Sequence, residues 1–85
     1  MANITMYCTT VCPYCIRAEM LLKQRGVTDI HKIHIDRDPD QRALMMQRTK
    51  RRTVPQIYIN DIHIGGYDEL AALDRASGLT PMLQA

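Results

Sequence analysis

The sequence contains neither tryptophan nor phenylalanine among its 85 residues, and four tyrosines supply its large aromatic rings. A core without those two residue types is built from isoleucine, leucine, valine and methionine, with each tyrosine placed where its hydroxyl reaches water or a partner. Because 46% of the residues are hydrophobic and 24% are charged, the composition is that of an ordered globular protein. The length predicts one small domain over residues 1–85.

Several other features are scarce. No stretch approaches the roughly 20 apolar residues that a membrane span needs, and the first residues lack the pattern of a signal peptide. The net charge is only +2, which gives no argument for nucleic-acid binding. Three cysteines do not make a disulfide framework for a secreted domain. We therefore expect a cytoplasmic protein with no membrane or nucleic-acid partner.

Two of the cysteines, Cys12 and Cys15, stand three residues apart between a β-prone run and an amphipathic run. Pro13 suits the first position of a helix, which makes Cys12 the N-cap. Both cysteines then lie on one face of the helix start, within reach of a disulfide. The helix N-terminus stabilises a thiolate at Cys12, whereas Cys15 lies one turn further in. We interpret Cys12 as a nucleophile and Cys15 as a more buried resolving thiol.

A metal knuckle is the alternative interpretation of such a pair. A structural zinc site needs four ligands, and the sequence has no second pair of this kind. His31 and His34 are three apart on a predicted strand and therefore point to opposite faces. We predict no metal site. Cys8 is interpreted as a small core or edge residue, with a regulatory thiol as the alternative.

Apolar patterning divides the chain into short elements. Strands are predicted at residues 4–8, 30–35, 57–59 and 62–64. Helices are predicted at residues 13–25, at a segment that starts at Pro39 and ends in the basic run 48–52, and at residues 67–77. A final short turn is expected at residues 80–81. Ala18, Leu21, Leu22, Leu70 and Leu73 are the helix positions expected to face inward.

Local signals define where these elements begin and end. Asp38 predicts a helix cap before Pro39, with the side chain of Gln41 reaching back to it. Gly26 and Gly78 predict helix ends. Glu19 and Lys23 are spaced for an ion pair on the first helix.

The order of the elements predicts an α/β fold. Asn60 and Asp61 predict a two-residue hairpin turn, with Ile59 opposite Ile62 and Ile57 opposite Ile64. A strand–helix–strand unit predicts a parallel pair. Together these give a four-stranded mixed sheet with three helices on its two faces, in the order βαβαββα. The first strand is expected to be central, with the cysteine pair at its carboxyl end.

Three motifs occur in order along the chain: Cys12-Pro13-Tyr14-Cys15, Thr53-Val54-Pro55-Gln56 and Gly65-Gly66-Tyr67-Asp68. With these motifs at their spacings, nearly the whole chain resembles the dithiol glutaredoxins of bacteria. The resemblance implies the thioredoxin fold, with Cys12 as the catalytic thiol and Cys15 as the second thiol. It also implies that Pro55 is a cis-proline facing the cysteines, where the residues alone leave a trans proline before an edge strand as the alternative.

The same resemblance implies a glutathione cleft. Tyr14 lines it, Thr53 flanks it, and the main chain of Val54 pairs with the cysteinyl unit of glutathione. The γ-glutamyl end is held by Gly66, Tyr67 and Asp68, and the backbone of Tyr67 is the part expected to matter. From the residues alone, Asp68 equally fits charge complementarity in the first turn of a helix. The basic run of Arg48, Lys50, Arg51 and Arg52 is either a solvated helix end or a source of attraction for the glycyl carboxylate. RNA binding is a third alternative, which the lack of an accompanying aromatic platform disfavours.

The implied activity is that of a glutathione-dependent thiol–disulfide oxidoreductase in electron transport and cell redox homeostasis. It would reduce glutathione mixed disulfides and protein disulfides, with ribonucleotide reductase among the candidate partners. Glutathione is the co-substrate, regenerated by glutathione reductase, and no tightly bound cofactor is expected. We expect a monomer.

Two rival functions stay open. One is a redoxin reduced by thioredoxin reductase, and the other is an iron–sulfur module that bridges two subunits through Cys12 and glutathione.

The chain departs from the family pattern at Thr9, which stands where glutaredoxins commonly have lysine, and this bears on the affinity for glutathione.

Overall fold

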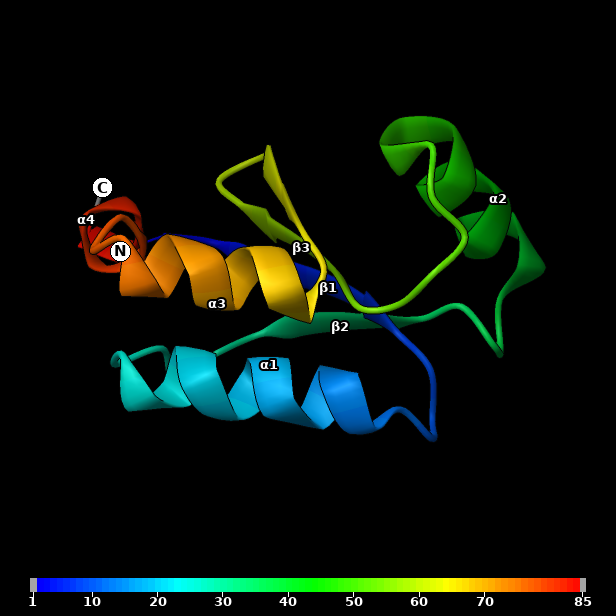
Figure 1. The fold of residues 1–85 in the computed structure, drawn as a ribbon. Helices are drawn as coiled ribbons and strands as arrows, with labels where there is room; N and C mark the ends of the chain where they lie inside the picture. Colours follow the sequence, from blue (N-terminus) through cyan, green and yellow to red (C-terminus); the bar gives the residue numbers. More distant parts are fainter. Residues whose placement is uncertain (1, 85) are drawn as a thin grey trace.

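The computed structural model describes residues 2–84, and its centre is one mixed sheet with the strand order β2-β1-β3-β4 (Figure 1). The strand β1 runs parallel to β2 and antiparallel to β3, and β3 runs antiparallel to β4. The strands are β1 (Ile4–Cys8), β2 (His31–His34), β3 (Gln56–Ile59) and β4 (Ile62–Gly65). The predicted α/β fold, with β1 inside a four-stranded mixed sheet, is confirmed.

The helices are α1 (Pro13–Gln24), α2 (Pro39–Thr49), α3 (Tyr67–Arg75) and α4 (Leu79–Gln84). The first three match the predicted helices, but α4 replaces the expected short turn at residues 80–81. Pro81 is compatible with α4 because it stands in the first turn, where backbone N–H groups have no partner within the helix. Leu79 and Leu83, one turn apart, are both buried, and this packing makes the segment helical.

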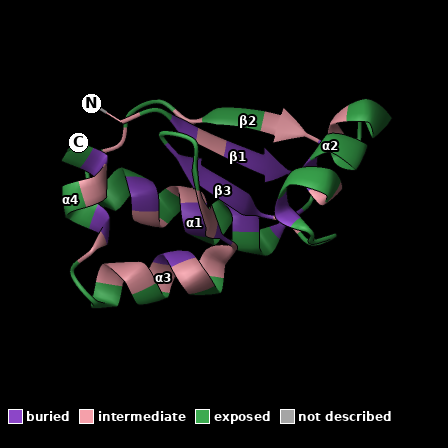
Figure 2. Cartoon of the chain, turned by 90° about the horizontal axis from the view of Figure 1, so that it is seen from above, coloured by how far each residue is buried: buried purple, intermediate pink, exposed green. Residues whose placement is uncertain are grey.

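The two faces of the sheet carry separate apolar clusters. On one face Met6 and Ile57 pack with Ala18, Leu22 and Leu70, which α1 and α3 contribute. On the other face Tyr7 and Tyr58 pack with Met45 of α2. Figure 2 shows the buried residues concentrated along β1 and β3, whereas the edge strand β2 is largely exposed. The inward positions predicted for α1 and α3 are thus confirmed, with Leu21 and Leu73 partly buried.

The local signals behaved as predicted except at the end of α3 and at Gln41, whose backbone N–H and not its side chain makes the bond recorded to Asp38. Asp38 caps α2 by accepting a hydrogen bond from the N–H of Gln41, at 3.2 Å. Gly26 follows α1 with a φ of 97°, and Glu19 pairs with Lys23 at 3.0 Å. At the end of α3, however, Ser77 and not Gly78 takes the left-handed conformation, with a φ of 62°.

The hairpin between β3 and β4 contains a β-bulge. Asn60 and Asp61 form the predicted turn, with φ values of 50° and 70°, and Ile59 pairs with Ile62. Ile57, however, pairs with Gly65 and not with Ile64, because β4 holds one extra residue. Gly65 adopts a φ of 118°, which a β-branched residue would not tolerate. The bulge redirects the chain into the start of α3.

The packing of α3 gives a first test of this fold. Replacing Leu70, which is fully buried, by alanine should lower the free energy of unfolding by about 2–5 kcal/mol through lost contacts and a cavity. The same change at Leu44, which is 39% exposed on α2, should cost less than about 1 kcal/mol. Urea unfolding measures both. Equal losses for the two variants would contradict the assignment of Leu70 to the core.

Candidate active site

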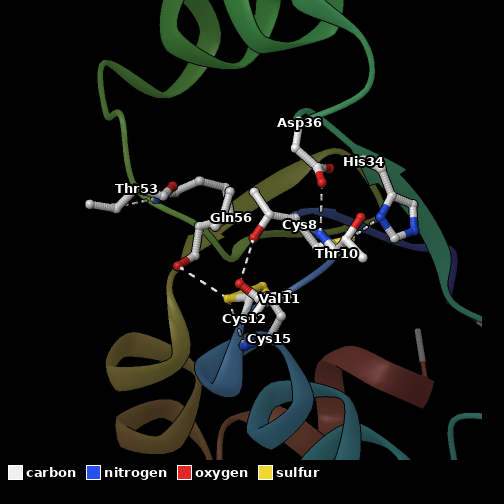
Figure 3. The surroundings of a disulfide bond; sticks show 11 residues. Cys8, Thr10, Val11, Cys12, Cys15, His34, Asp36, Thr53 and Gln56 are labelled. Atoms are coloured by element: carbon white, nitrogen blue, oxygen red, sulfur yellow. Dashed lines mark hydrogen bonds between the residues drawn. A yellow bond between two sulfur atoms is a disulfide. The ribbon is translucent and has the colours of Figure 1, made fainter.

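The two cysteines of the first motif form a disulfide at the start of α1, with their Cα atoms 5.2 Å apart (Figure 3). Cys12 is the N-cap, Pro13 is the first helical residue, and the N–H of Cys15 donates a hydrogen bond to Sγ of Cys12 at 3.2 Å. Both side chains are buried, at 8% exposed for Cys12 and 5% for Cys15. The contrast in burial that the sequence predicted is therefore slight in the disulfide form.

The segment that precedes β3 faces this disulfide. The peptide bond between Val54 and Pro55 is cis, as the resemblance implied. Sγ of Cys12 lies 3.9 Å from the carbonyl oxygen of Val54. The pairing of Tyr7 with Gln56 brings the carboxyl end of β1 and the start of β3 together, so the segment after β1 and the segment before β3 meet at the same end of these two strands.

A cleft of about 340 Å³ opens next to Tyr14, which lies between the two cysteines, and Val54, which faces Cys12; neither cysteine is among its lining residues. The structure brings all seven residues that the resemblance assigned to glutathione together in its lining. These are Tyr14, Thr53, Val54, Pro55, Gly66, Tyr67 and Asp68. They come from the start of α1, the segment before β3 and the start of α3, so the cleft exists only because the sheet juxtaposes these three places.

Two further residues line the cleft, Arg51 and Glu69. The carboxylate of Glu69 accepts a hydrogen bond from the N–H of Gly66 at 2.9 Å and pairs with the guanidinium of Arg51. The Gly66 hydrogen bond, followed by that of Arg51, holds the pKa of Glu69 below its ordinary value. Sequence reasoning missed Glu69. Its position three residues after the helix cap was the available signal, because a glutamate there reaches back to the cap.

The basic run before the cleft divides into separate roles. Arg48 lies on the α2 face of the sheet, where it donates a hydrogen bond to the Tyr7 hydroxyl at 3.0 Å and stacks 4.3 Å from the centre of the Tyr58 ring. All three of Lys50, Arg51 and Arg52 are exposed, and of these Arg51 lines the cleft. Arg51 is therefore the residue of the run that could act as a cation in the cleft, whereas Lys50 and Arg52 fit a solvated helix end.

Two tyrosines form an aromatic wall of the cleft. Tyr14 is 53% exposed, and its ring centre lies 6.2 Å from that of Tyr67. Arg17 stacks over the Tyr14 ring at 5.3 Å. Only the backbone of Tyr67 was expected to matter, but its side chain also lines the cleft.

The segment before the cysteine pair is held by β2 and by the turn that follows it. The N–H of Thr10 donates a hydrogen bond to the Asp36 carboxylate at 3.1 Å (Figure 3). Cys8 is buried, and its Sγ lies 3.8 Å from Nδ1 of His34. Burial raises the pKa of the Cys8 thiol, so this residue fits the predicted core role.

Within residues 2–84, no three histidine, cysteine, aspartate or glutamate side chains gather in a group that could hold a metal ion. Over the same range, no helix is both long and apolar enough to span a membrane.

Comparisons with known proteins agree with this geometry. The glutaredoxin family model matches residues 4–64. Glutaredoxin 3 of Escherichia coli is 46% identical over 99% of this chain and its own full length, and the glutaredoxin of Pseudomonas aeruginosa is 45% identical over the full length of both. A crystal structure of a buckwheat glutaredoxin–glutathione complex superposes with a TM-score of 0.87 at 34% identity, over 98% of this chain and 77% of that one. The chain belongs to the glutaredoxin family and is a glutathione-dependent thiol–disulfide oxidoreductase.

Proposed function

We propose that Cys12 is the nucleophile of this oxidoreductase and that Cys15 is the resolving thiol. The observation that carries the assignment is the hydrogen bond from the N–H of Cys15 to Sγ of Cys12, at 3.2 Å, at the N-terminus of α1. In the reduced protein the same N–H group and the helix dipole stabilise a thiolate at Cys12. Among residues 2–84, no backbone N–H donates a hydrogen bond to Sγ of Cys15, which serves as the second thiol.

The reaction with a glutathionylated protein takes two exchanges. The Cys12 thiolate attacks the glutathione sulfur, a bond forms between these two sulfurs, and the substrate sulfur leaves with the electron pair of the broken disulfide. A glutathione thiolate then attacks the glutathione sulfur of the adduct, which gives glutathione disulfide and restores the Cys12 thiolate. One glutathione is oxidised for each substrate thiol released.

Protein disulfides require both cysteines. After Cys12 forms a mixed disulfide with the substrate, Cys15 attacks Sγ of Cys12 and expels the second substrate thiol. This produces the bond between Cys12 and Cys15 that the structure contains. Two glutathione molecules then reduce this bond in successive exchanges.

The cleft accounts for the choice of glutathione as co-substrate. In this proposal the main chain of Val54 pairs with the cysteinyl unit, Thr53 flanks it, and Pro55 and Tyr14 cover its sides. The γ-glutamyl end lies at the start of α3, where Gly66 and Tyr67 contribute backbone and Asp68 takes the ammonium group. Support comes from the lining of the cleft by all these residues and from the related buckwheat glutaredoxin, which was solved with glutathione.

The wider setting is also a proposal. The chain works as one domain over residues 1–85, as a monomer in the cytoplasm, with glutathione as co-substrate and no tightly bound cofactor. Its substrates are glutathionylated proteins and protein disulfides, with ribonucleotide reductase as a candidate. Glutathione reductase returns the electrons, and the protein contributes to electron transport and cell redox homeostasis. The bacterial glutaredoxins that match the chain over its full length support this setting.

Cysteine variants test the assignment of roles. Cys12→Ser should abolish reduction of a glutathionylated peptide, because Cys8 is buried and Cys15 lacks the N-cap position that stabilises a thiolate. Cys15→Ser should keep this activity but lose reduction of a protein disulfide. Cys8→Ala should keep both. The assay couples turnover to glutathione and glutathione reductase. Activity in Cys12→Ser, or turnover supported only by thioredoxin reductase, would contradict the proposal.

A second pair of variants tests the γ-glutamyl site. Asp68→Asn should raise the KM for a glutathionylated peptide about tenfold with little change in kcat, because a charge-assisted hydrogen bond of about 1.5 kcal/mol is lost. Asp40→Asn is the matched control, since Asp40 also occupies the second position of its helix, α2, outside the cleft. It should leave KM unchanged. Equal KM values for the two variants would show that Asp68 serves only the helix dipole.

A further inference from the structure

A buried amide lies directly behind the cleft. Gln56 is the first residue of β3, follows the cis bond and is 0% exposed. Its Nε2 donates hydrogen bonds to the carbonyl oxygen of Thr53 at 3.0 Å and to the Thr53 hydroxyl at 3.3 Å. Figure 3 shows the side chain of Gln56 next to Thr53. Its Oε1 lies 2.8 Å from Nε2 of His63. Each polar atom of this buried side chain therefore has a partner.

These contacts determine which atoms carry hydrogen. The carbonyl oxygen of Thr53 only accepts, so the nitrogen of the Gln56 amide must face it. Oε1 consequently faces His63, and Nε2 of His63 must be the protonated nitrogen that donates to it. The hydrogen bonds are therefore all donated in one direction: His63 donates to Gln56, and Gln56 donates to Thr53.

The imidazole is itself held in place. His63 pairs with Tyr58 across the hairpin, and their ring centres lie 5.1 Å apart. Arg48 covers the same tyrosine at 4.3 Å. Burial lowers the pKa of His63, Arg51 and Arg48 lower it as well, and Glu69 opposes them. Nε2 keeps its proton in both the neutral and the charged imidazole, so the donor to Gln56 persists over a wide pH range.

The hydrogen bond from Gln56 to the Thr53 carbonyl determines how the main chain of Val54 is oriented in the cleft. The carbonyl of Thr53 and the N–H of Val54 belong to one planar peptide unit, in which they point in opposite directions. A hydrogen bond that pulls the Thr53 carbonyl toward Gln56 therefore turns the Val54 N–H away from the interior. On its other side, the Val54 carbonyl lies 3.9 Å from Sγ of Cys12. Both polar groups of Val54 depend on the orientation of this short segment.

We propose that Gln56 and His63 are positioning residues, which hold Thr53 and so aim the Val54 main chain at the glutathionyl group of the substrate. The inference rests on the proposed glutathione cleft. Neither residue lines the cleft, so both act through Thr53. Their removal lowers the affinity for the glutathionyl group and leaves the chemistry of Cys12 intact.

The test uses two replacements of His63 in the full chain. His63→Phe keeps a ring against Tyr58 but removes the donor, and it should raise the KM for a glutathionylated peptide about fivefold, with kcat within about twofold. His63→Gln restores an N–H donor of similar reach and should return KM to within about twofold of wild type. Gln56→Met should resemble His63→Phe, whereas Gln47→Met, the same change on the exposed surface of α2, should have no effect.

A second readout separates positioning from general damage. The reduced protein reacts in a single turnover with either glutathione disulfide or hydroxyethyl disulfide, which has no glutathionyl group. His63→Phe should slow only the first reaction. Equal slowing of both reactions, or failure of His63→Gln to rescue, would overturn the positioning role and leave a structural one. If wild type reacted equally fast with both disulfides, the glutathione cleft itself would be refuted. If wild type preferred glutathione disulfide and His63→Phe kept that preference, only the positioning role would be refuted.

Discussion

The antiparallel pairing of β1 with β3 is the constraint on which the site depends. Tyr7 lies opposite Gln56, so the end of β1 meets the start of β3 at one edge of the sheet. The chain leaves β1 toward Cys12 and enters β3 from Pro55, and this pairing places Sγ of Cys12 3.9 Å from the Val54 carbonyl. A shift of one residue in this register would turn every side chain of the strand to the opposite face and separate the two segments.

The chemistry then follows from where α1 begins. A cysteine at the N-cap gains a backbone hydrogen bond from Cys15 and the positive end of the helix dipole. Both effects favour negative charge on sulfur, the form that attacks a disulfide. The start of α3 follows the bulge at Gly65, and its residues Gly66, Tyr67 and Asp68 line the cleft together with Val54 and Pro55. The proposed nucleophile and the cleft residues thus come from two helix starts that one sheet holds in place.

Local chemistry explains which parts of this architecture the sequence predicts. The cap at Asp38, the turn at Asn60 and Asp61, and the helix start at Pro13 each depend on residues within four positions, so their signals are readable in the chain. The resemblance to glutaredoxins supplied the residues of the cleft, which span three distant segments. Neither source predicted the bulge that pairs Ile57 with Gly65, because a register slip depends on how the hairpin joins α3.

Other features depend on packing that no single segment specifies. The helix α4 forms because Leu79 and Leu83 are buried against the rest of the core. The Glu69 bonds to Gly66 and Arg51, and the Gln56 bonds to Thr53 and His63, join residues that only the folded chain brings together. Sequence patterns report propensity and periodicity, and these contacts are set by tertiary structure.

The central claim is that the N-terminus of α1 stabilises the thiolate of Cys12. The direct measurement is the pH dependence of thiolate absorbance in the reduced Cys15→Ser variant, with Cys12→Ser as the reference that removes the contribution of Cys8. The account predicts that the pKa of Cys12 lies below the value of about 8.5 for a free cysteine, because the helix start stabilises the thiolate. Titration of Cys12 at or above about 8.5 would contradict it, because the helix start would then provide no stabilisation of the nucleophile.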